Sequence, residues 1–381
     1  MTSHPFYTEE HEAFRATVRE FVERELRPHA SEWDEAGEFP RELYEKAGAV
    51  GLLGAGFPER YGGLGNEDAF TRLIIDQEVA RCGAGGLQAS LVGSFYISQP
   101  PILKLGSEEL KQRILPDTIA GRKIGALAIT EPGGGSDVAQ MTTAAVRDGD
   151  DYVVNGQKTF ITSGMRADYY TVAVRTGGAG MDGISLLVIE RDRPGFARTP
   201  LDKMGWWCSD TATLYFEDCR VPVANRLGPE NRGFRAIVSN FNYERLDMVA
   251  ISTASARICF EEALAYARER KTFGKRLADH QVIRHKLVEM SRQVNATQAL
   301  LEMLAWRLDH GQNPVAEICE AKVQATLAFE FCAREAAQVL GGASYLRGNV
   351  VERLYREVRV QAIGGGSEEI MRDLAARQMR I

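Results

Sequence analysis

Residues 283–308, with the sequence IRHKLVEMSRQVNATQALLEMLAWRL, decide the fold class. Apolar side chains recur in this stretch at alternating steps of four and three, and Thr297 is the one polar member of the series. That spacing places a continuous apolar seam along one face of a helix. The seam ends where Gly311 and Pro314 interrupt the pattern. Residues 318–339 repeat the rhythm with smaller side chains, which allow close helix approach, so the pattern predicts a helical bundle.

The chain before this bundle has two parts that differ in periodicity. The first part is helical, with Phe14, Val18 and Phe21 on one face of a helix that Thr8 caps and Pro28 closes. The second part has the short apolar runs and turn residues of strands, and Asn155-Gly156 predicts a two-residue hairpin within it. We therefore predict a mostly α fold with a central β domain, in three parts: an N-terminal helical domain (1–120), a small antiparallel β-barrel or sandwich (121–230) and a C-terminal four-helix bundle (231–381).

Composition excludes several classes of protein. The 381 residues carry a formal net charge of −6, which gives no reason to expect nucleic acid as a partner. No apolar run is long enough for a membrane span, and the polar, acidic N-terminus resembles no targeting segment, so we expect a cytoplasmic protein. The six cysteines are scattered without a CxxC pair, so neither a disulfide framework nor a metal site is expected.

Nucleotide-binding motifs of the common kinds are missing from the sequence. Neither GxGxxG nor GxxxxGK[ST] occurs, and the order helices, sheet, helices does not suit a doubly wound nucleotide fold. Any nucleotide cofactor must therefore be held in another way.

Two segments in the β region have residues suited to a flat ligand. The first, AITEPGGGSD at 128–137, places three glycines between the hydroxyls of Thr130 and Ser136, and glycine permits close backbone approach. The second, QKTFITSG at 157–164, puts Phe160 and Thr162 on one face of a strand. Taken singly, an ordinary surface turn and a half-buried strand explain them as well.

Two further segments lie in the C-terminal helical region. The cation-rich RERKTFGK at 268–275, followed by Gln281, is typical of a solvated face, although the embedded Phe and Gly also suit a phosphate site. The segments QVLGG at 338–342 and IGGGSEEI at 363–370 place glycines in a helical context, where each costs about 1 kcal/mol relative to alanine. A loop against a ligand and a plain helix-ending loop both explain these glycines.

In this order and spacing, the four segments resemble the acyl-CoA dehydrogenase family, and the resemblance covers essentially the whole chain. It implies a homotetramer that holds FAD between domains and between subunits. The implied flavin-ring residues are Leu127, Ile129, Thr130, Phe160 and Thr162, with Ser136 where flavin and thioester tail meet. The implied residues at the adenine end of an FAD shared with a neighbouring subunit are Arg270, Phe273, Gln281, Gln338 and Gly342. Ser367 and Glu369 would close over the cofactor.

The position of the catalytic base departs from one family pattern and matches another. Many members carry the base in a C-terminal Tyr-Glu-Gly-Thr motif, where this chain has Gly364-Gly365-Gly366-Ser367. Long-chain and isovaleryl-type members instead carry it on a helix just before an arginine, as in Asn242-Tyr243-Glu244-Arg245. The resemblance therefore implies Glu244 as the base, with Asn242 and Arg245 on the CoA. A surface ion pair at a helix start is the simpler interpretation of Glu244-Arg245 taken alone.

The resemblance implies FAD-dependent α,β-dehydrogenation of an acyl-CoA thioester to the trans-2-enoyl-CoA, with electrons passed to an electron-transferring flavoprotein. In the family the thioester carbonyl accepts hydrogen bonds from the flavin ribityl chain and from a backbone N–H of the C-terminal loop. Gly364 and Gly365 remove bulk from the substrate pocket, so we expect a long or branched acyl chain. The alternatives are a flavin oxidase of the acyl-CoA oxidase or nitroalkane oxidase type and, less favoured, a non-catalytic acyl-CoA-binding scaffold. The role of Trp206-Trp207 stays open.

Overall fold

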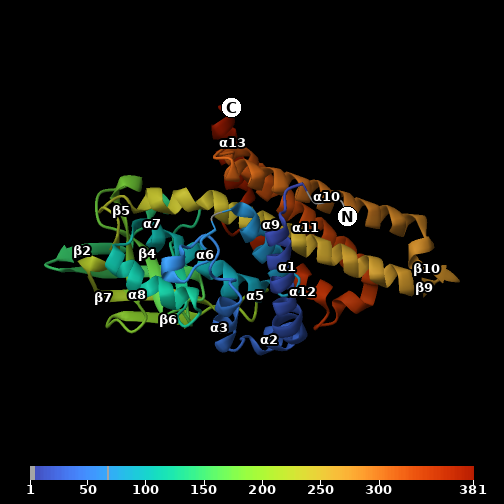
Figure 1. The fold of residues 1–381 in the computed structure, drawn as a ribbon, viewed down its shortest axis with the longest axis horizontal. Helices are drawn as coiled ribbons and strands as arrows, with labels where there is room; N and C mark the ends of the chain where they lie inside the picture. Colours follow the sequence, from blue (N-terminus) through green and yellow to red (C-terminus); the bar gives the residue numbers. More distant parts are fainter. Residues whose placement is uncertain (1–4, 67) are drawn as a thin grey trace.

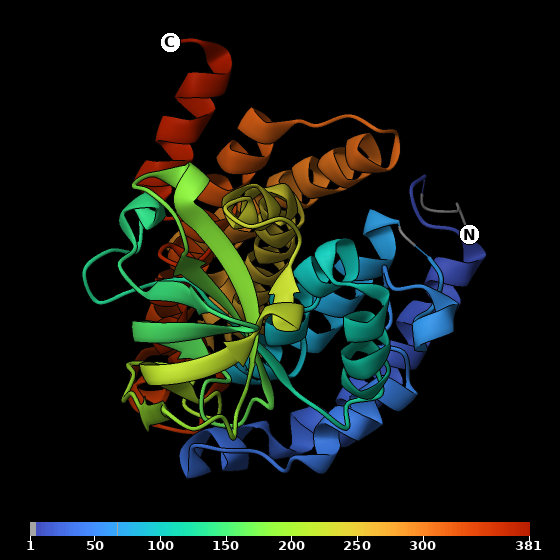
Figure 2. The ribbon, with the colours of Figure 1, turned by 90° about the vertical axis from the view of Figure 1, so that its left-hand side faces the viewer.

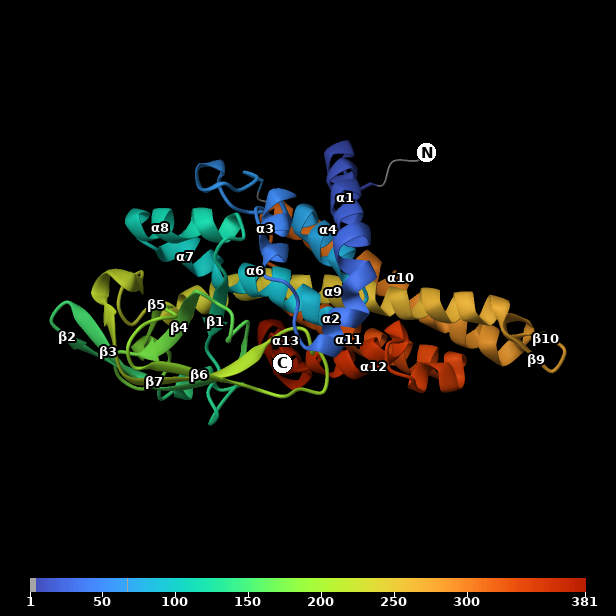
Figure 3. The same cartoon turned by 90° about the horizontal axis from the view of Figure 1, so that it is seen from below.

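The computed structural model describes residues 5–66 and 68–381, without the side chains at 235, 236 and 238–240. The molecule is elongated, and its central sheet lies at one end of the long axis (Figure 1). The helix α9 (Gly233–Glu269) runs from the sheet toward the opposite end, where the strands β9 (Lys271–Thr272) and β10 (Lys275–Arg276) form a small hairpin (Figures 1 and 3). This long helix therefore connects regions that are far apart in space.

The N-terminal region is helical, as predicted. Thr8 caps its first helix and accepts a hydrogen bond from the N–H of His11 at 3.2 Å. Pro28 does not end the helical path, contrary to the sequence prediction, because it lies in a short 3₁₀ turn after which α2 begins. The helices are α1 (Glu9–Phe21), α2 (Ala30–Ala36), α3 (Glu42–Ala49), α4 (Ala69–Ala80), α5 (Gly85–Leu87), α6 (Ser94–Ser98), α7 (Pro100–Leu105) and α8 (Glu108–Ile119).

The central sheet has eight strands, seen from their end of the molecule in Figure 2. Seven follow the order β6-β7-β3-β2-β4-β5-β8, and β1 pairs with β4. The pairing is antiparallel except between β1 and β4 and at one residue pair of β2 and β4, so the sheet is not purely antiparallel as predicted. The strands are β1 (Gly125–Ala128), β2 (Ala144–Asp148), β3 (Asp151–Thr162), β4 (Tyr169–Arg175), β5 (Ile184–Glu190), β6 (Phe196–Pro200), β7 (Thr211–Pro222) and β8 (Arg226–Leu227).

The hairpin predicted at Asn155-Gly156 is wrong. Strand β3 continues through these residues, and its pairing with β7 has a β-bulge there. Gly156 is needed there for space, since a Cβ on it would lie 2.7 Å from the Cα of Thr143 on the neighbouring segment. The turn between β2 and β3 falls instead at Gly149-Asp150. The sequence pattern therefore identified Gly156 as a position that requires glycine, but it predicted a turn where the structure has a strand.

The C-terminal region contains the predicted bundle. The seam of residues 283–308 lies in α10 (Gln281–Asp309), and the small-residue seam lies in α11 (Val315–Leu340). These helices pack with α9, α12 (Val350–Gln361) and α13 (Glu368–Met379), which projects to the C-terminus (Figure 2). The triple glycine at 364–366 forms the link between α12 and α13.

Two further findings bear on the expectations from composition. All six cysteines are free and buried. In residues 5–66 and 68–381, no helix is long and apolar enough to cross a membrane. The cytoplasmic location stays a prediction.

Candidate active site

The structure brings the two alternative base positions together. Glu244 lies in α9, and Gly365 lies in the α12–α13 link, 121 positions later in the chain. A Cβ atom placed on Gly365 would lie 3.8 Å from Oε1 of Glu244. A carboxyl group on either residue would therefore reach the same region of space.

The backbone of this link requires glycine. Gly365 has φ +63° and Gly366 has φ +102°, conformations that residues with a side chain rarely adopt. The space beside Gly365 is occupied by Met248, since a Cβ on Gly365 would clash with its Sδ. Met248 is one helical turn after Glu244, so both side chains lie on the same face of α9.

Burial sets the ionisation of Glu244. Removal of the carboxyl from water and the nearby Asp247 carboxylate raise the pKa of Glu244 to about 7, against the lowering effect of Arg245, Lys322 and Arg72. No hydrogen bond from a described residue reaches this carboxylate. Glu244 therefore has an acid–base pKa suited to neutral pH and oxygens that are available to a ligand.

A buried network lies beside Glu244, between α4 and α9. Asp247 pairs with Arg72, whose guanidinium lies 4.0 Å from the ring centre of Tyr96. Asp76 accepts a hydrogen bond from Gln88 at 2.7 Å, and burial raises its pKa well above the ordinary value. This network fixes the segment of α9 that carries Glu244, and sequence analysis gave no indication of it.

Lys322 is a second residue of the site that sequence analysis missed. It lies on α11, is fully buried, and donates to the carbonyl oxygens of Gly364, at 2.7 Å, and Gly366. Burial lowers the pKa of Lys322 to about 8, and the charge of Arg245 acts in the same direction. Its signal in the sequence was a lone lysine in the small-residue seam of 318–339, a position where an unpaired charge needs a reason.

The two residues assigned to CoA differ in their surroundings. Arg245 is 7% exposed and its Nε has no hydrogen-bond partner in the described chain. The described residues offer its guanidinium no ion pair, and the ring of Phe241 lies 5.2 Å away. Asn242 donates to Asn313 at 2.6 Å. A buried, unpaired guanidinium suits an anionic ligand group.

The residues assigned to the flavin ring come from two adjacent segments. The N–H of Thr159 donates to the carbonyl of Thr130 at 2.9 Å, and Lys158 donates to the carbonyl of Ile129 at 3.0 Å. These bonds hold the segment that follows β1 against β3. Phe160 projects from this junction with φ +59° and 70% exposure, although Ile161 beside it is buried.

An exposed aromatic ring held by a strained backbone suits stacking against a flat ligand. Four other residues assigned to the flavin ring are half-buried: Leu127, Ile129, Thr130 and Thr162. Ser136, in contrast, is exposed in the glycine loop. These residues therefore fit a flavin ring, and the hydroxyls of Thr130 and Thr162 can hydrogen-bond its edge.

The residues assigned to the adenine end lie at the other end of the molecule. Arg270 and Phe273 lie in the β9–β10 hairpin region, and Gln281 begins α10 there (Figure 1). Phe273 is 96% exposed with φ +51°. Gln338 and Gly342, near the end of α11, are exposed as well. Within one chain this group lies at the opposite end of the long axis from the central sheet, to whose strand β3 Phe160 belongs (Figure 1).

The last two residues assigned to the cofactor lie at the start of α13. Ser367 caps this helix and accepts a hydrogen bond from the N–H of Ile370 at 3.4 Å. Glu369 is exposed in the first turn, where a negative charge is favourable. Both residues thus contribute to the start of α13, and both lie beside the glycine link.

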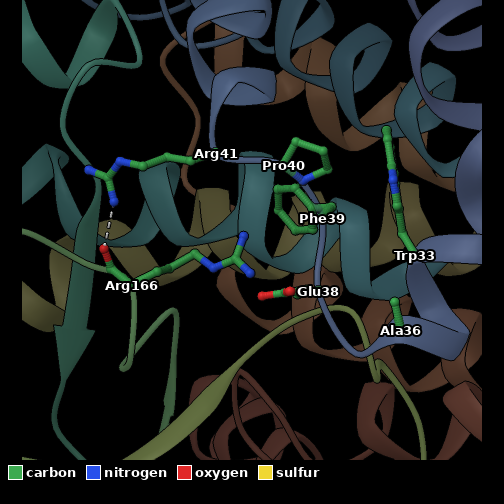
Figure 4. A pocket seen from close by; sticks show the side chains of 7 residues that line it. All are labelled: Trp33, Ala36, Glu38, Phe39, Pro40, Arg41 and Arg166. Carbon is green, nitrogen blue, oxygen red and sulfur yellow. Dashed lines mark hydrogen bonds between the residues drawn. The ribbon is translucent and has the colours of Figure 1, made fainter.

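A separate surface hollow lies between α2, α3 and the turn after β3. Figure 4 shows it, with Arg41 donating to the carbonyl of Arg166 at 3.1 Å. None of the seven residues around it is a predicted site residue; they are Trp33, Ala36, Glu38, Phe39, Pro40, Arg41 and Arg166. It does not include Glu244 or the residues assigned to the flavin ring.

Comparison with known proteins identifies the family. Three family models match in series: the acyl-CoA dehydrogenase N-terminal domain at residues 8–122, the middle domain at 126–219 and the C-terminal domain at 231–380. The mitochondrial long-chain specific acyl-CoA dehydrogenase of Sus scrofa is 37% identical, over 98% of this chain and 87% of its own.

Two solved structures show the same agreement. A probable acyl-CoA dehydrogenase from Mycobacterium abscessus has a TM-score of 0.96 and 46% identity, over 98% of this chain and 100% of its own. Butyryl-CoA dehydrogenase from Megasphaera elsdenii has a TM-score of 0.94 and 30% identity, over 98% and 99%. The matches run the length of the chain and agree with its three-part fold, and the chain is therefore an enzyme of the acyl-CoA dehydrogenase family.

Proposed function

We propose that this enzyme dehydrogenates an acyl-CoA thioester between its α and β carbons, with Glu244 as the base that takes the α proton. The observation that carries the proposal is the 3.8 Å between Oε1 of Glu244 and the Cβ position of Gly365. The Glu244 carboxylate lies beside the position of Gly365, and the pKa of about 7 makes it an effective proton acceptor at neutral pH.

We propose FAD as the cofactor, because the family's members are FAD-dependent flavoproteins and the residues present fit its ring. Bound FAD would supply the acceptor for the β hydrogen and its electron pair. The product is then the trans-2-enoyl-CoA. The exposed ring of Phe160 and the hydroxyls of Thr130 and Thr162 would hold the flavin, and Arg245 would meet a charged group of CoA.

The separation of the two FAD-binding groups supports a homo-oligomer. The β9–β10 hairpin, with Phe273, lies at the opposite end of the long axis from the sheet that carries Phe160, so we infer that a second subunit holds the adenine end of one FAD (Figure 1). We propose a homotetramer, as the family resemblance implies, with an electron-transferring flavoprotein as the electron acceptor.

We propose a long or branched acyl chain as the substrate. Gly364 and Gly365 leave no side chain at the link, and the neighbouring space is filled by the end of Met248. Methionine is unbranched and flexible, so it can move aside for a bulky substrate more easily than a Tyr or Glu in the link could.

The test is an anaerobic titration of the FAD-loaded enzyme with acyl-CoA thioesters of different length and branching, followed by loss of flavin absorbance. Loss of absorbance with long or branched thioesters, and none with Glu244→Gln, would support the reaction, the base and the substrate class. No response to any thioester would contradict the function, and a response that survives the substitution would contradict the base. Steady hydrogen peroxide release in air would favour an oxidase instead.

A further inference from the structure

The ammonium of Lys322 is held by backbone carbonyl groups alone. It is fully buried and donates to Gly364 and Gly366, and no carboxylate of the described chain lies within ion-pair distance. Burying an ammonium without an ionic partner is costly. The ammonium of Lys322 is bound by two carbonyl groups of the link that lies beside Glu244. We therefore infer that this charge has a role in function rather than in stability.

The geometry of the peptide bond turns a backbone donor of the link away from Lys322. The chain has no cis peptide bond in its described residues, so the carbonyl of Gly364 and the N–H of Gly365 point in opposite directions. The carbonyl faces Lys322, and the N–H therefore points away from it. That N–H donates to no described residue. Gly365 also faces Glu244, with its Cβ position 3.8 Å from Oε1.

We propose that Lys322 is a positioning residue that polarises the Gly364–Gly365 peptide, so that the N–H of Gly365 donates a strengthened hydrogen bond to the thioester carbonyl. This inference rests on the proposed function. Hydrogen bonds in a chain strengthen one another, and a cation at the carbonyl end makes the N–H at the other end a better donor. When Glu244 takes the α proton, negative charge develops on the thioester oxygen, and a preorganised donor stabilises it.

The charges around Lys322 decide when this effect operates. Arg245 on α9 lowers the pKa of Lys322. Three groups raise it: Glu244 on α9, Glu368 on α13 and the Cys319 thiol on α11. With burial as the largest cause, the pKa is about 8. The ammonium is thus present at neutral pH and is lost above about pH 8.

The experiment measures polarisation of the thioester directly. A 2,2-dimethylacyl-CoA has no α hydrogen and cannot react, so its ¹³C-labelled carbonyl reports the site by infrared difference spectroscopy on the FAD-loaded enzyme. The variant is Lys322→Met, which keeps the chain length without charge. Lys203→Met is the matched control, because Lys203 also donates to two carbonyls of one loop, those of Trp206 and Ser209.

We expect the bound carbonyl frequency to lie below its value in water in the wild type and in Lys203→Met, and to return toward it in Lys322→Met. The rate of flavin reduction by a reactive thioester should fall about 100-fold in Lys322→Met, with a change in the dissociation constant below about threefold. An unchanged carbonyl frequency in Lys322→Met, or an equal loss in Lys203→Met, would overturn the proposal.

A second measurement needs no substitution at Lys322 and so holds even if that variant does not fold. In Glu244→Gln, where the base cannot titrate, the downward shift of the carbonyl should disappear as pH rises and should be gone above about pH 8, because the loss of the Glu244 carboxylate removes one of the charges that raise the pKa of Lys322. A shift that persists at pH 9.5 would overturn the proposal. If the wild type binds and bleaches with no thioester, the proposed function itself fails, which is a distinguishable result.

Discussion

Two glutamates of this enzyme have raised pKa values but lie in very different surroundings. Glu244 faces the glycine link between α12 and α13, and burial raises its pKa to about 7. Glu357 lies on α12, where burial and the Asp34 carboxylate raise its pKa to about 8. By ionisation alone, Glu357 would be an equally good candidate for a catalytic acid or base.

The difference lies in the space around each carboxyl. Glu357 accepts a hydrogen bond from the N–H of Gly85 at 2.8 Å, and a Cβ on Gly85 would lie 3.0 Å from its Oε2. The backbone at Gly205 is equally close, since a Cβ there would lie 3.0 Å from the Cα of Glu357. Glu357 is thus enclosed by backbone, whereas Glu244 faces a link without side chains. A raised pKa marks a buried carboxyl, and access for a ligand distinguishes a base from a structural group.

The largest expected effect separates these two residues. Glu244→Gln should slow flavin reduction by an acyl-CoA about 10³-fold, because the amide cannot take the α proton. Glu357→Gln should stay within about threefold of the wild type, because its carboxyl touches no substrate. Stopped-flow absorbance under anaerobic conditions measures both rates. Equal losses in the two variants would mean that the chemical step depends on the buried structure in general.

Moving the carboxyl to the other base position is the next test. The double variant Glu244→Gly/Gly365→Glu should recover about tenfold in flavin reduction over Glu244→Gly, because the two positions reach the same region. Recovery should be partial, since φ +63° costs a residue with a side chain about 1–2 kcal/mol and Met248 must move.

The matched control for this rescue is Glu244→Gly/Gly364→Glu. A Cβ on Gly364 has Val360 and Met248, not Glu244, among its nearest neighbours, so this carboxyl should recover nothing. Equal recovery from both positions would show that the link tolerates a base anywhere and that the 3.8 Å proximity has no special value.

Sequence reasoning predicted most of the fold because the helices carry strong periodicity. The seam of 283–308 and the small-residue seam fell on α10 and α11, and the predicted β-forming runs fell on β3, β4, β5 and β7. The hairpin at Asn155-Gly156 failed because a glycine that serves close backbone packing has the same local signature as one that serves a turn. Only the contact of Gly156 with Thr143, which forms when the sheet forms, distinguishes a packing glycine from a turn glycine.

The candidate site was predictable in part. Once both family patterns are known, the sequence shows that Glu is present at position 244 and absent at position 365. It does not show that these two positions lie close together in space. Lys322 was missed because a lone lysine in an apolar seam carries no motif, and its partners are backbone carbonyls at Gly364 and Gly366 rather than side chains. Backbone acceptors leave no residue-type signal for a sequence pattern to detect.

A smaller effect concerns the pH dependence of the reaction. The rate of flavin reduction should rise as pH increases through about 7, because Glu244 must be ionised to act. Asp247→Asn removes the carboxylate that raises this pKa and leaves the cations Arg72, Arg245 and Lys322, so the rise should move down by about 0.5–1 pH unit. The pH profile of Glu357→Gln, measured alongside, should keep the wild-type midpoint. A midpoint unaffected by Asp247→Asn would mean that burial alone sets the pKa.

The smallest effect is on stability and tests the structural role of Glu357. Its pKa is about 8 in the folded enzyme against an ordinary value of 4.5, so between these values the folded form holds a proton that the unfolded chain has released. Stability therefore falls as pH rises through this window, by about 1–3 kcal/mol from this group, and falls no further above about pH 8. Glu357→Gln keeps an acceptor for Gly85 and cannot ionise, so its Tm should decline less than that of the wild type between pH 5 and pH 8.5 in calorimetry. Parallel curves would mean that Glu357 is ionised in the folded enzyme, and the contrast with Glu244 would then need another cause than enclosure by backbone.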